Sequence, residues 1–220
     1  MTTSTGTSTE RLTRLLQLAS PALPIGAFSY SSGLEAAVEA GIVRDAASAE
    51  RWIGDVLAHS VGRMEAPVLV RMMRDADGLR KWNEVFLASR ESAELRAETV
   101  QMGYSLARLL ADLGAGAVPL DEPSYPAAFA FAAAAWRIDP ERALVAYLWA
   151  WAENQVMAAI KAVPLGQTQA QRMLLVLGAQ VEAVAREAMA AGDEPLSNFT
   201  PGLAMLSSQH ETQYSRLFRS

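Results

Sequence analysis

The segment between Asp139 and Val163 constrains the fold of this chain more than any other part of the sequence. It opens with Asp139-Pro140-Glu141, a typical helix start that combines a capping side chain, a proline at the first helical position and an acid near the positive end of the helix dipole. Apolar residues then occupy two sides of the expected helix: Leu144, Leu148 and Trp151 on one side, and Val145, Trp149 and Val156 on another. A helix that is apolar nearly all round is normally buried, so this segment predicts the central helix of a bundle, ended by Val163-Pro164-Leu165-Gly166.

Helical periodicity also dominates the rest of the chain, and no run shows a convincing strand alternation. The first expected helix has Leu12, Leu15, Leu16 and Ala19 on its inner face and ends at Ser20-Pro21. The second begins with a capping box at Ser32 and Glu35 and stops at Gly41, and the third is capped by Asp45. Three more helices are expected near residues 79–88, over 91–113 and over about 168–191. The sequence therefore predicts an all-α fold, a single-domain helical bundle of roughly eight to ten helices. We expect a flexible N-terminus over residues 1–9, an all-helical domain over 10–200, and a separate tail over 201–220.

Composition excludes several classes of function. The chain has no cysteine, which rules out disulfides and thiolate metal sites and favours a cytoplasmic location. Its formal net charge is −5 and it has no long basic run, so we expect no nucleic-acid binding. No uncharged run reaches the roughly 18 apolar residues of a membrane span, so we expect no membrane insertion. The first nine residues also lack the features of a signal peptide.

A search for catalytic chemistry finds little. The two histidines, His59 and His210, lack the spacing of a ligand pair, and no base-and-orienter set accompanies either of them. The chain has no GxxxxGK[ST] phosphate loop, so we do not expect it to hydrolyse nucleotides itself. Glu94 and Glu98 lie one helical turn apart and are expected to pair with Arg90 and Arg96 on a solvated face. No catalytic, cofactor or metal residue is predicted.

Three segments carry side chains that folding alone does not explain. They are PALPIGAFSYSSGLE at residues 21–35, the polar residues from Glu153 to Lys161 within an otherwise apolar helix, and the aromatic chain end SSQHETQYSRLFRS. Phe28 and Tyr30 are either exposed anchors for a partner or an inward-facing hydrophobic staple. Lys161 is either a surface contact or a charge that compensates the helix dipole, and the tail either binds a partner or docks on its own core.

At these same places the sequence closely resembles the UreF family of urease accessory proteins. The resemblance rests on LLQLASPALPIGAFSYSSGLE at 15–35, ASRESAELRAETVQMG at 88–103, ENQVMAAIKAVPLGQT at 153–168 and HETQYSRLFRS at 210–220. It implies a non-enzymatic, all-α homodimer that bridges UreD (also called UreH) and the GTPase UreG on apo-urease and gates GTP-dependent nickel insertion. It also implies a tunnel through UreF and UreD that carries the ion onward.

The resemblance further implies which residues bind partners, and it implies no cofactor. Lys161, Arg216 and Arg219 would face the GTPase, and the tail from His210 to Arg219 would order on UreD. Phe28, Ser29, Tyr30 and Glu35 would contact UreG or a second copy. The remaining residues expected to bind partners are Gln167, Glu211 and Tyr214. Ser32 departs from the larger polar residue of many relatives, which weakens any metal-ligand role there.

Two other classes of function stay open. One is a helical enzyme or ligand-binding module with a pocket lined by Tyr147, Trp149 and Trp151, which would need a closed cavity with convergent polar groups and a shifted pKa. The other is a direct nickel-binding chaperone, in which His59 or His210 would meet acidic residues in space.

Overall fold

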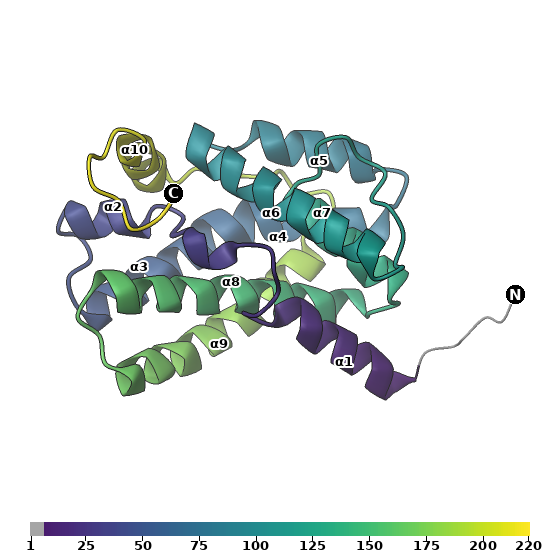
Figure 1. Cartoon of the computed structure of the whole chain (residues 1–220), viewed down its shortest axis with the longest axis horizontal. Helices are drawn as coiled ribbons and strands as arrows, with labels where there is room; N and C mark the ends of the chain where they lie inside the picture. Colours follow the sequence, from purple (N-terminus) through teal and green to yellow (C-terminus); the bar gives the residue numbers. More distant parts are fainter. Residues whose placement is uncertain (1–6) are drawn as a thin grey trace, which may run out of the picture.

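A computed structural model of the chain, which describes residues 7–220, is helical throughout, and no strand occurs among those residues (Figure 1). The elements are α1 (Ser8–Ala19), the 3-10 turn η1 (Ala27–Ser29), α2 (Leu34–Glu39), α3 (Ala46–Val56), the π-helix η2 (Leu57–Glu65), α4 (Ala66–Arg74), α5 (Leu79–Ala88), α6 (Ala93–Asp112), α7 (Tyr125–Ala135), α8 (Pro140–Ala162), α9 (Gln167–Ala190) and α10 (Pro201–His210). The all-α prediction is confirmed. Of the N-terminus expected to be flexible, residues 1–6 lie outside the described part, whereas Ser8 and Thr9 already belong to α1.

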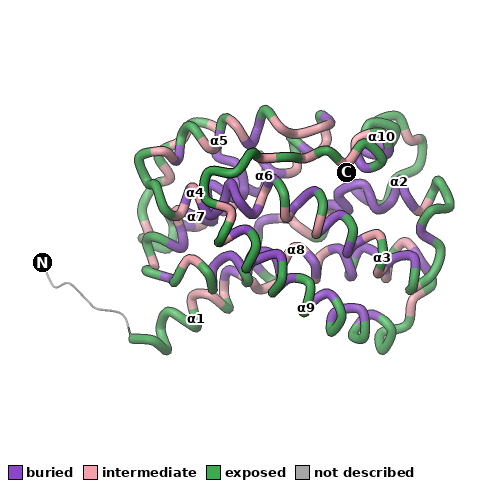
Figure 2. Tube along the Cα trace, turned by 180° about the vertical axis from the view of Figure 1, so that it is seen from behind, coloured by how far each residue is buried: buried purple, intermediate pink, exposed green. Residues whose placement is uncertain are grey.

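Helix α8 is the centre of the bundle, as its apolar pattern predicts. Asp139 accepts a hydrogen bond from the Arg142 N–H (3.1 Å) and caps the helix, and Pro140 is its first residue. Leu144 and Leu148 are completely buried. Helices α1, α4 and α9 all pack against α8, and Figure 2 shows most of its trace as buried or intermediate.

The hydrophobic core has two parts that meet along α8. The larger part lies between α4, α6, α7 and the first half of α8 and includes the stacked rings of Tyr125 and Tyr147 (5.1 Å between centroids). The smaller part lies between α2, α3, α9 and the second half of α8. Trp52 and Trp151 pack against both parts and join them.

Helices α3 and α4 are one continuous helix interrupted by the nine-residue π-helix η2. Pro67 lies in the first turn of α4, directly after η2. At Gly62 a Cβ atom would lie 2.9 Å from the Leu57 carbonyl oxygen and 2.9 Å from Val184 Cγ1, so only glycine fits there without displacement. Such π segments inside helices occur frequently at functional sites, and this one ends on Glu65, which lines a cavity described below.

The predicted inner face of α1 was wrong for Leu12 and Leu16, whereas Leu15 packs against the core as predicted. Leu18 is 1% exposed and faces the core, whereas Leu12 and Leu16 are 50% and 60% exposed. The helix lies at the edge of the bundle and packs mainly against α8, so only a narrow stripe of its surface is covered. The spacing of apolar residues alone does not show which side of α1 faces α8.

The predicted capping box at Ser32 was also wrong. Ser32 has a left-handed backbone (φ 50°), and Gly33 (φ 86°) is the residue that precedes α2. Ser31 Oγ, not Ser32 Oγ, accepts the hydrogen bond from the Glu35 N–H (3.2 Å). The Ser32 side chain instead donates to Glu98 Oε1 on α6 (2.9 Å), a contact across 66 residues that local spacing does not reveal.

Helix α10 was not expected from the sequence. It begins at Pro201, a residue type common at the first helical position, after an irregular stretch that follows α9. It packs on α2 and α6 and buries Leu203 and Leu206. Residues 201–210 are therefore a packed helix, and only residues 211–220 form an irregular tail.

Candidate functional site

The tail, residues 211–220, lies against the molecule beside α2 and α10 (Figure 1, yellow). Its backbone pairs with the segment before α2: the Arg219 N–H donates to the Ser29 carbonyl (2.8 Å), and the Ser31 N–H donates to the Ser220 carbonyl (3.1 Å). Phe218 is buried among the residues of the smaller core. In this structure the tail docks on its own core, which was one of the two alternatives.

Glu35 is the residue on which the tail converges. Its Oε1 accepts from the Leu217 N–H (2.7 Å) and its Oε2 accepts from the Phe218 N–H (2.9 Å). His210 Nε2 lies 3.2 Å from the same Oε2. The Glu35 side chain is buried, so water competes little for its hydrogen bonds to the tail. Glu35 therefore fixes the path of the tail from inside the molecule.

A second carboxylate completes this network. Glu94 Oε2 lies 2.6 Å from His210 Nδ1, and its Oε1 accepts from Arg216 Nη1 (2.6 Å). His210 thus has a carboxylate on each ring nitrogen and is fully buried. The expectation that neither histidine has such partners was wrong for His210, because both partners come from helices distant in sequence.

The predicted pairing of Glu94 and Glu98 with Arg90 and Arg96 was wrong as well. Arg90 lies near Glu65 (3.7 Å), and Arg96 forms an ion pair with Glu122 (2.6 Å). Glu94 and Glu98 point toward the tail and the start of α2 instead of a solvated face. Glu94 and Glu98 do lie one helical turn apart on α6, but tertiary packing decides which residues they contact.

Glu98 holds the end of the tail. Its Oε2 accepts from Ser220 Oγ (2.6 Å) and its Oε1 from Ser32 Oγ (2.9 Å). Burial raises the pKa of Glu98 from 4.5 to about 7, and the two hydroxyl hydrogen bonds offset only part of that rise. Burial also raises the pKa of Glu65.

These raised pKa values predict that the protein becomes less stable as pH rises toward neutrality. Between pH 4.5 and 7 the folded protein keeps a proton on Glu98 that the unfolded chain releases, so the free energy of unfolding falls across this window, by up to about 3 kcal/mol. Glu65 acts in the same direction. Urea unfolding at pH 5, 6, 7 and 8 measures the slope. The Glu98→Gln variant should show a shallower slope, and an equal slope in both proteins would contradict the assignment.

The segment before α2 separates its two aromatic residues. Phe28 is 68% exposed, whereas Tyr30 is buried and donates from its hydroxyl to Gln101 Oε1 (2.5 Å). Lys161 Nζ lies 5.8 Å from the Phe28 ring centroid and 5.5 Å from that of Phe218. Phe28 is therefore exposed as an anchor for a partner would be, whereas Tyr30 is a core residue.

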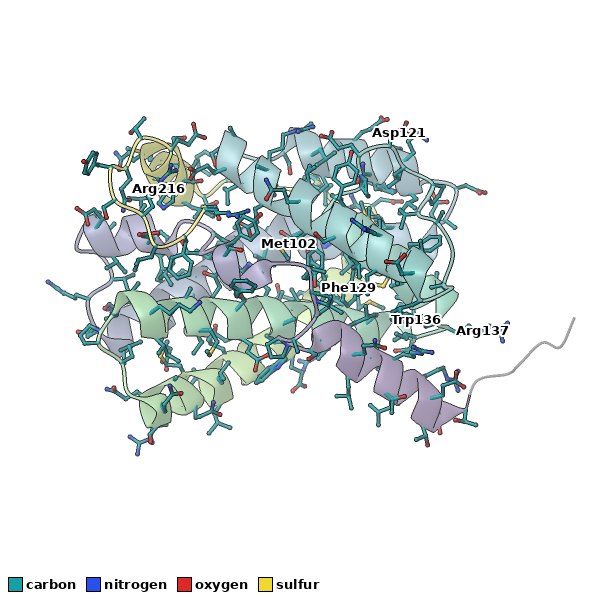
Figure 3. All side chains as sticks on the ribbon, in the orientation of Figure 1. Met102, Asp121, Phe129, Trp136, Arg137 and Arg216 are labelled. Atoms are coloured by element: carbon teal, nitrogen blue, oxygen red, sulfur yellow. The ribbon has the colours of Figure 1, made fainter. Side chains whose placement is uncertain are left out.

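The other predicted partner-binding residues lie in different positions. Glu35 and His210 are internal, and Ser29 is half-buried. Glu211 accepts from the Ala93 N–H at the start of α6 (2.8 Å), and Gln167 is exposed at the start of α9. The exposed residues that gather around the tail are Phe28, Lys161, Tyr214, Arg216, Leu217 and Arg219, and we call this set the C-terminal surface. Figure 3 shows Arg216 on the tail beside α10, far from Trp136 and Arg137 near α1.

A cavity of about 380 Å³ lies beside this surface. Tyr147 and Trp151 line it, together with Glu65, Glu91 and Glu98. Trp149, which the sequence places in the same pocket, is not in the lining and lies instead at the contact between α8 and α9 near Gly178. A cavity with polar residues in its lining is therefore present, but it opens beside the exposed residues Phe28 and Lys161, whereas the ligand-binding alternative requires a closed one.

Within residues 7–220 no three His, Asp or Glu side chains are grouped to hold a metal ion. His59 is exposed on η2. None of the helices in the same residues has both the length and the apolar character needed to cross a membrane.

Comparison with known proteins agrees with the resemblance read from the four blocks. The sequence profile of the UreF family matches residues 43–178. The urease accessory protein UreF of Azoarcus sp. (strain BH72) is 61% identical over 223 aligned residues, covering 95% of both chains. Those of Dechloromonas aromatica (strain RCB) and Janthinobacterium sp. (strain Marseille) are 54% and 51% identical, each with 96% of this chain covered. This chain therefore belongs to the UreF family of urease accessory proteins.

Proposed function

We propose that this protein is a non-enzymatic maturation factor that bridges UreD (UreH) and the GTPase UreG on apo-urease and gates GTP-dependent nickel insertion. In this proposal it acts in the cytoplasm as a homodimer. Family membership supports a role in urease maturation, and the division of labour among these partners is our inference.

The observation that carries the proposal is the C-terminal surface. Tyr214 is completely exposed, and Phe28 and Leu217 are 68% and 70% exposed, so three large apolar side chains face solvent within one region. Arg216 and Arg219 lie among them. Aromatic residues and arginine are the residue types that dominate binding energy at protein interfaces, and their exposure here contributes nothing to the core.

The network beneath the surface supports the same interpretation. Glu35 and Glu94 hold the tail through its backbone, through His210 and through Arg216. A surface fixed in this way loses little conformational entropy when a partner binds, which favours affinity. The buried residues of the family's blocks would therefore act indirectly, by holding the exposed ones in place.

The test is size-exclusion chromatography with light scattering on this protein mixed with its cognate UreD and UreG. We expect the double variant Tyr214→Ala/Arg219→Ala to weaken assembly by about 30-fold, because loss of interface hot spots costs about 2 kcal/mol or more. Arg137→Ala is the matched control, because this exposed arginine lies at the opposite end of the molecule (Figure 3). Circular dichroism confirms that each variant is folded. Assembly by the double variant at wild-type concentrations would remove the C-terminal surface from the proposal, and absence of any wild-type complex would remove the bridging role.

A further inference from the structure

The cavity beside the C-terminal surface has an apolar wall that the bridging function does not require. Six of the residues that form this wall are Leu18, Leu23, Ile25, Val56, Val61 and Met102. Met102, labelled in Figure 3, lies near the centre of the molecule, so the cavity extends into the core. A volume of about 380 Å³ lies within the range of small-molecule sites.

The polar groups that line the inner part of the cavity have partners within the protein. The Tyr147 hydroxyl donates to Glu65, and Arg90 Nη1 lies 3.7 Å from the same carboxyl group. Glu98 accepts from two serine hydroxyls, at 2.6 and 2.9 Å. The Arg90 and Glu65 side chains are only 9% and 13% exposed. A ligand in the inner part of the cavity therefore meets mainly hydrocarbon.

The mouth of the cavity lies beside the last turns of α8. Met157 and Lys161, four residues apart on this helix, are exposed and line the cavity, as does Phe28 of η1. Lys161 Nζ lies 3.4 Å from the Phe28 carbonyl oxygen and 5.8 Å from the centroid of its ring. Phe28 and Met157 are 68% and 45% exposed, so the apolar lining continues to the surface.

Lys161 supplies a positive charge at this mouth. No ion pair joins it to a carboxylate of residues 7–220, and its hydrogen bond to the Phe28 carbonyl is long. Glu153 also lines the cavity, but it precedes Lys161 by eight residues, which is about 12 Å along the helix. A cation without a counter-ion at the opening of an apolar cavity is complementary to a ligand with one negative charge at the end of an apolar chain.

We propose that the cavity binds a free fatty acid of medium chain length. The carboxylate of the ligand pairs with Lys161 Nζ at the mouth, and its alkyl chain passes Met157 and Trp151 and reaches the apolar wall at Met102. The ligand is the free acid and not a lipid held in a bilayer, because the whole chain must enter the core of the protein. This inference does not depend on the bridging role, and its test uses the isolated protein.

The first experiment is calorimetric titration with butyrate, hexanoate, octanoate and octylammonium. Each added methylene of the acids should tighten binding by about fourfold, the change that corresponds to about 0.8 kcal/mol per buried methylene. Octylammonium, with the same chain as octanoate and the opposite charge, should bind at least about tenfold more weakly than octanoate. Octanoate at about ten times its Kd should also raise the Tm by about 3–5 °C, since binding to the folded state alone stabilises it.

Two outcomes of this titration would contradict the proposal. Absence of octanoate binding, or affinities that do not rise from butyrate to octanoate, would overturn the fatty-acid site. Equal or tighter binding of octylammonium would overturn the assignment of a carboxylate head group.

A variant at the mouth locates the head group. Lys161→Gln should weaken octanoate binding by about threefold or more and leave the binding of 1-octanol unchanged, because only the acid carries the charge that pairs with Lys161. Lys81→Gln is the matched control, since this exposed lysine on α5 is not in the lining. Full octanoate affinity in Lys161→Gln would place the carboxylate elsewhere and overturn its assignment.

Tryptophan fluorescence locates the alkyl chain. Octanoate should change the fluorescence of wild type and of Trp149→Phe, and that change should be lost in Trp151→Phe, because Trp151 lines the cavity and Trp149 does not. A signal that survives in Trp151→Phe would place the chain outside this cavity and overturn the site.

Discussion

Replacing Glu35 by alanine is expected to release the tail and to destabilise the protein by about 3–5 kcal/mol, the range found when one partner of a buried charged group is removed. The substitution leaves the Leu217 and Phe218 N–H groups without their acceptor and one ring nitrogen of His210 without its partner. The tail groups can regain partners only by moving into water, so the tail should detach before the bundle unfolds.

Amide hydrogen exchange and urea unfolding together measure this effect. Exchange at Leu217 and Phe218 should accelerate by about 10²-fold or more, because each tenfold corresponds to 1.4 kcal/mol. Glu39→Ala is the matched control: it removes an exposed glutamate from the same helix, α2, and should change stability by less than about 0.5 kcal/mol. Unchanged exchange in the Glu35 variant would show that the tail is held by other contacts.

The second large effect is expected at Gly103, where α6 lies against the chain that leads into α7. A Cβ atom there would lie 2.0 Å from the Pro123 carbonyl oxygen and 2.6 Å from the carbonyl carbon of Ser124. Both atoms belong to the backbone and cannot turn aside as a side chain would. We expect Gly103→Ala to cost about 3 kcal/mol or more, and to lower the Tm by about 6–12 °C.

Gly178 supplies the control for this substitution. It lies within α9, and a Cβ atom there would meet only Trp149 Cζ3 at an ordinary 3.6 Å. Gly178→Ala should therefore stabilise the protein by about 0.5–1 kcal/mol, since alanine favours a helix over glycine. The measurement is the Tm of wild type and of both variants in thermal unfolding. Equal Tm values for all three would mean that α6 and α7 separate easily.

Local chemistry accounts for what the sequence predicted well. Asp139 and Asp45 cap their helices through hydrogen bonds to residues three positions later, and such contacts follow from spacing alone. The burial of α8 follows from its sequence. Apolar residues lie on two sides of the helix, so burying only one side would leave the other side exposed to water. The all-α class, the central helix and most helix ends were therefore predictable.

Long-range contacts account for what the sequence did not predict. The partners of His210 lie 116 and 175 residues away, and those of Glu98 lie 66 and 122 residues away. Nothing in the local pattern of α6 distinguishes Glu94, which faces the tail, from a glutamate on a solvated face. The four blocks of the resemblance marked the right segments. They did not separate the exposed members, such as Phe28, from internal ones such as Tyr30.

The π-helix η2 also makes this part of the chain sensitive to the insertion or deletion of a residue. Each residue of an α-helix turns the chain by about 100°, so one residue inserted or lost between Leu57 and Glu65 would rotate all of α4 by that angle. The rotation would turn Val68 and Leu69 out of the core and carry Glu65 away from Tyr147. We therefore expect insertions and deletions in this long helix to destabilise the protein. We expect them to be tolerated better at exposed turns such as that around Gly114, where an added Cβ atom would have no other atom within 4 Å.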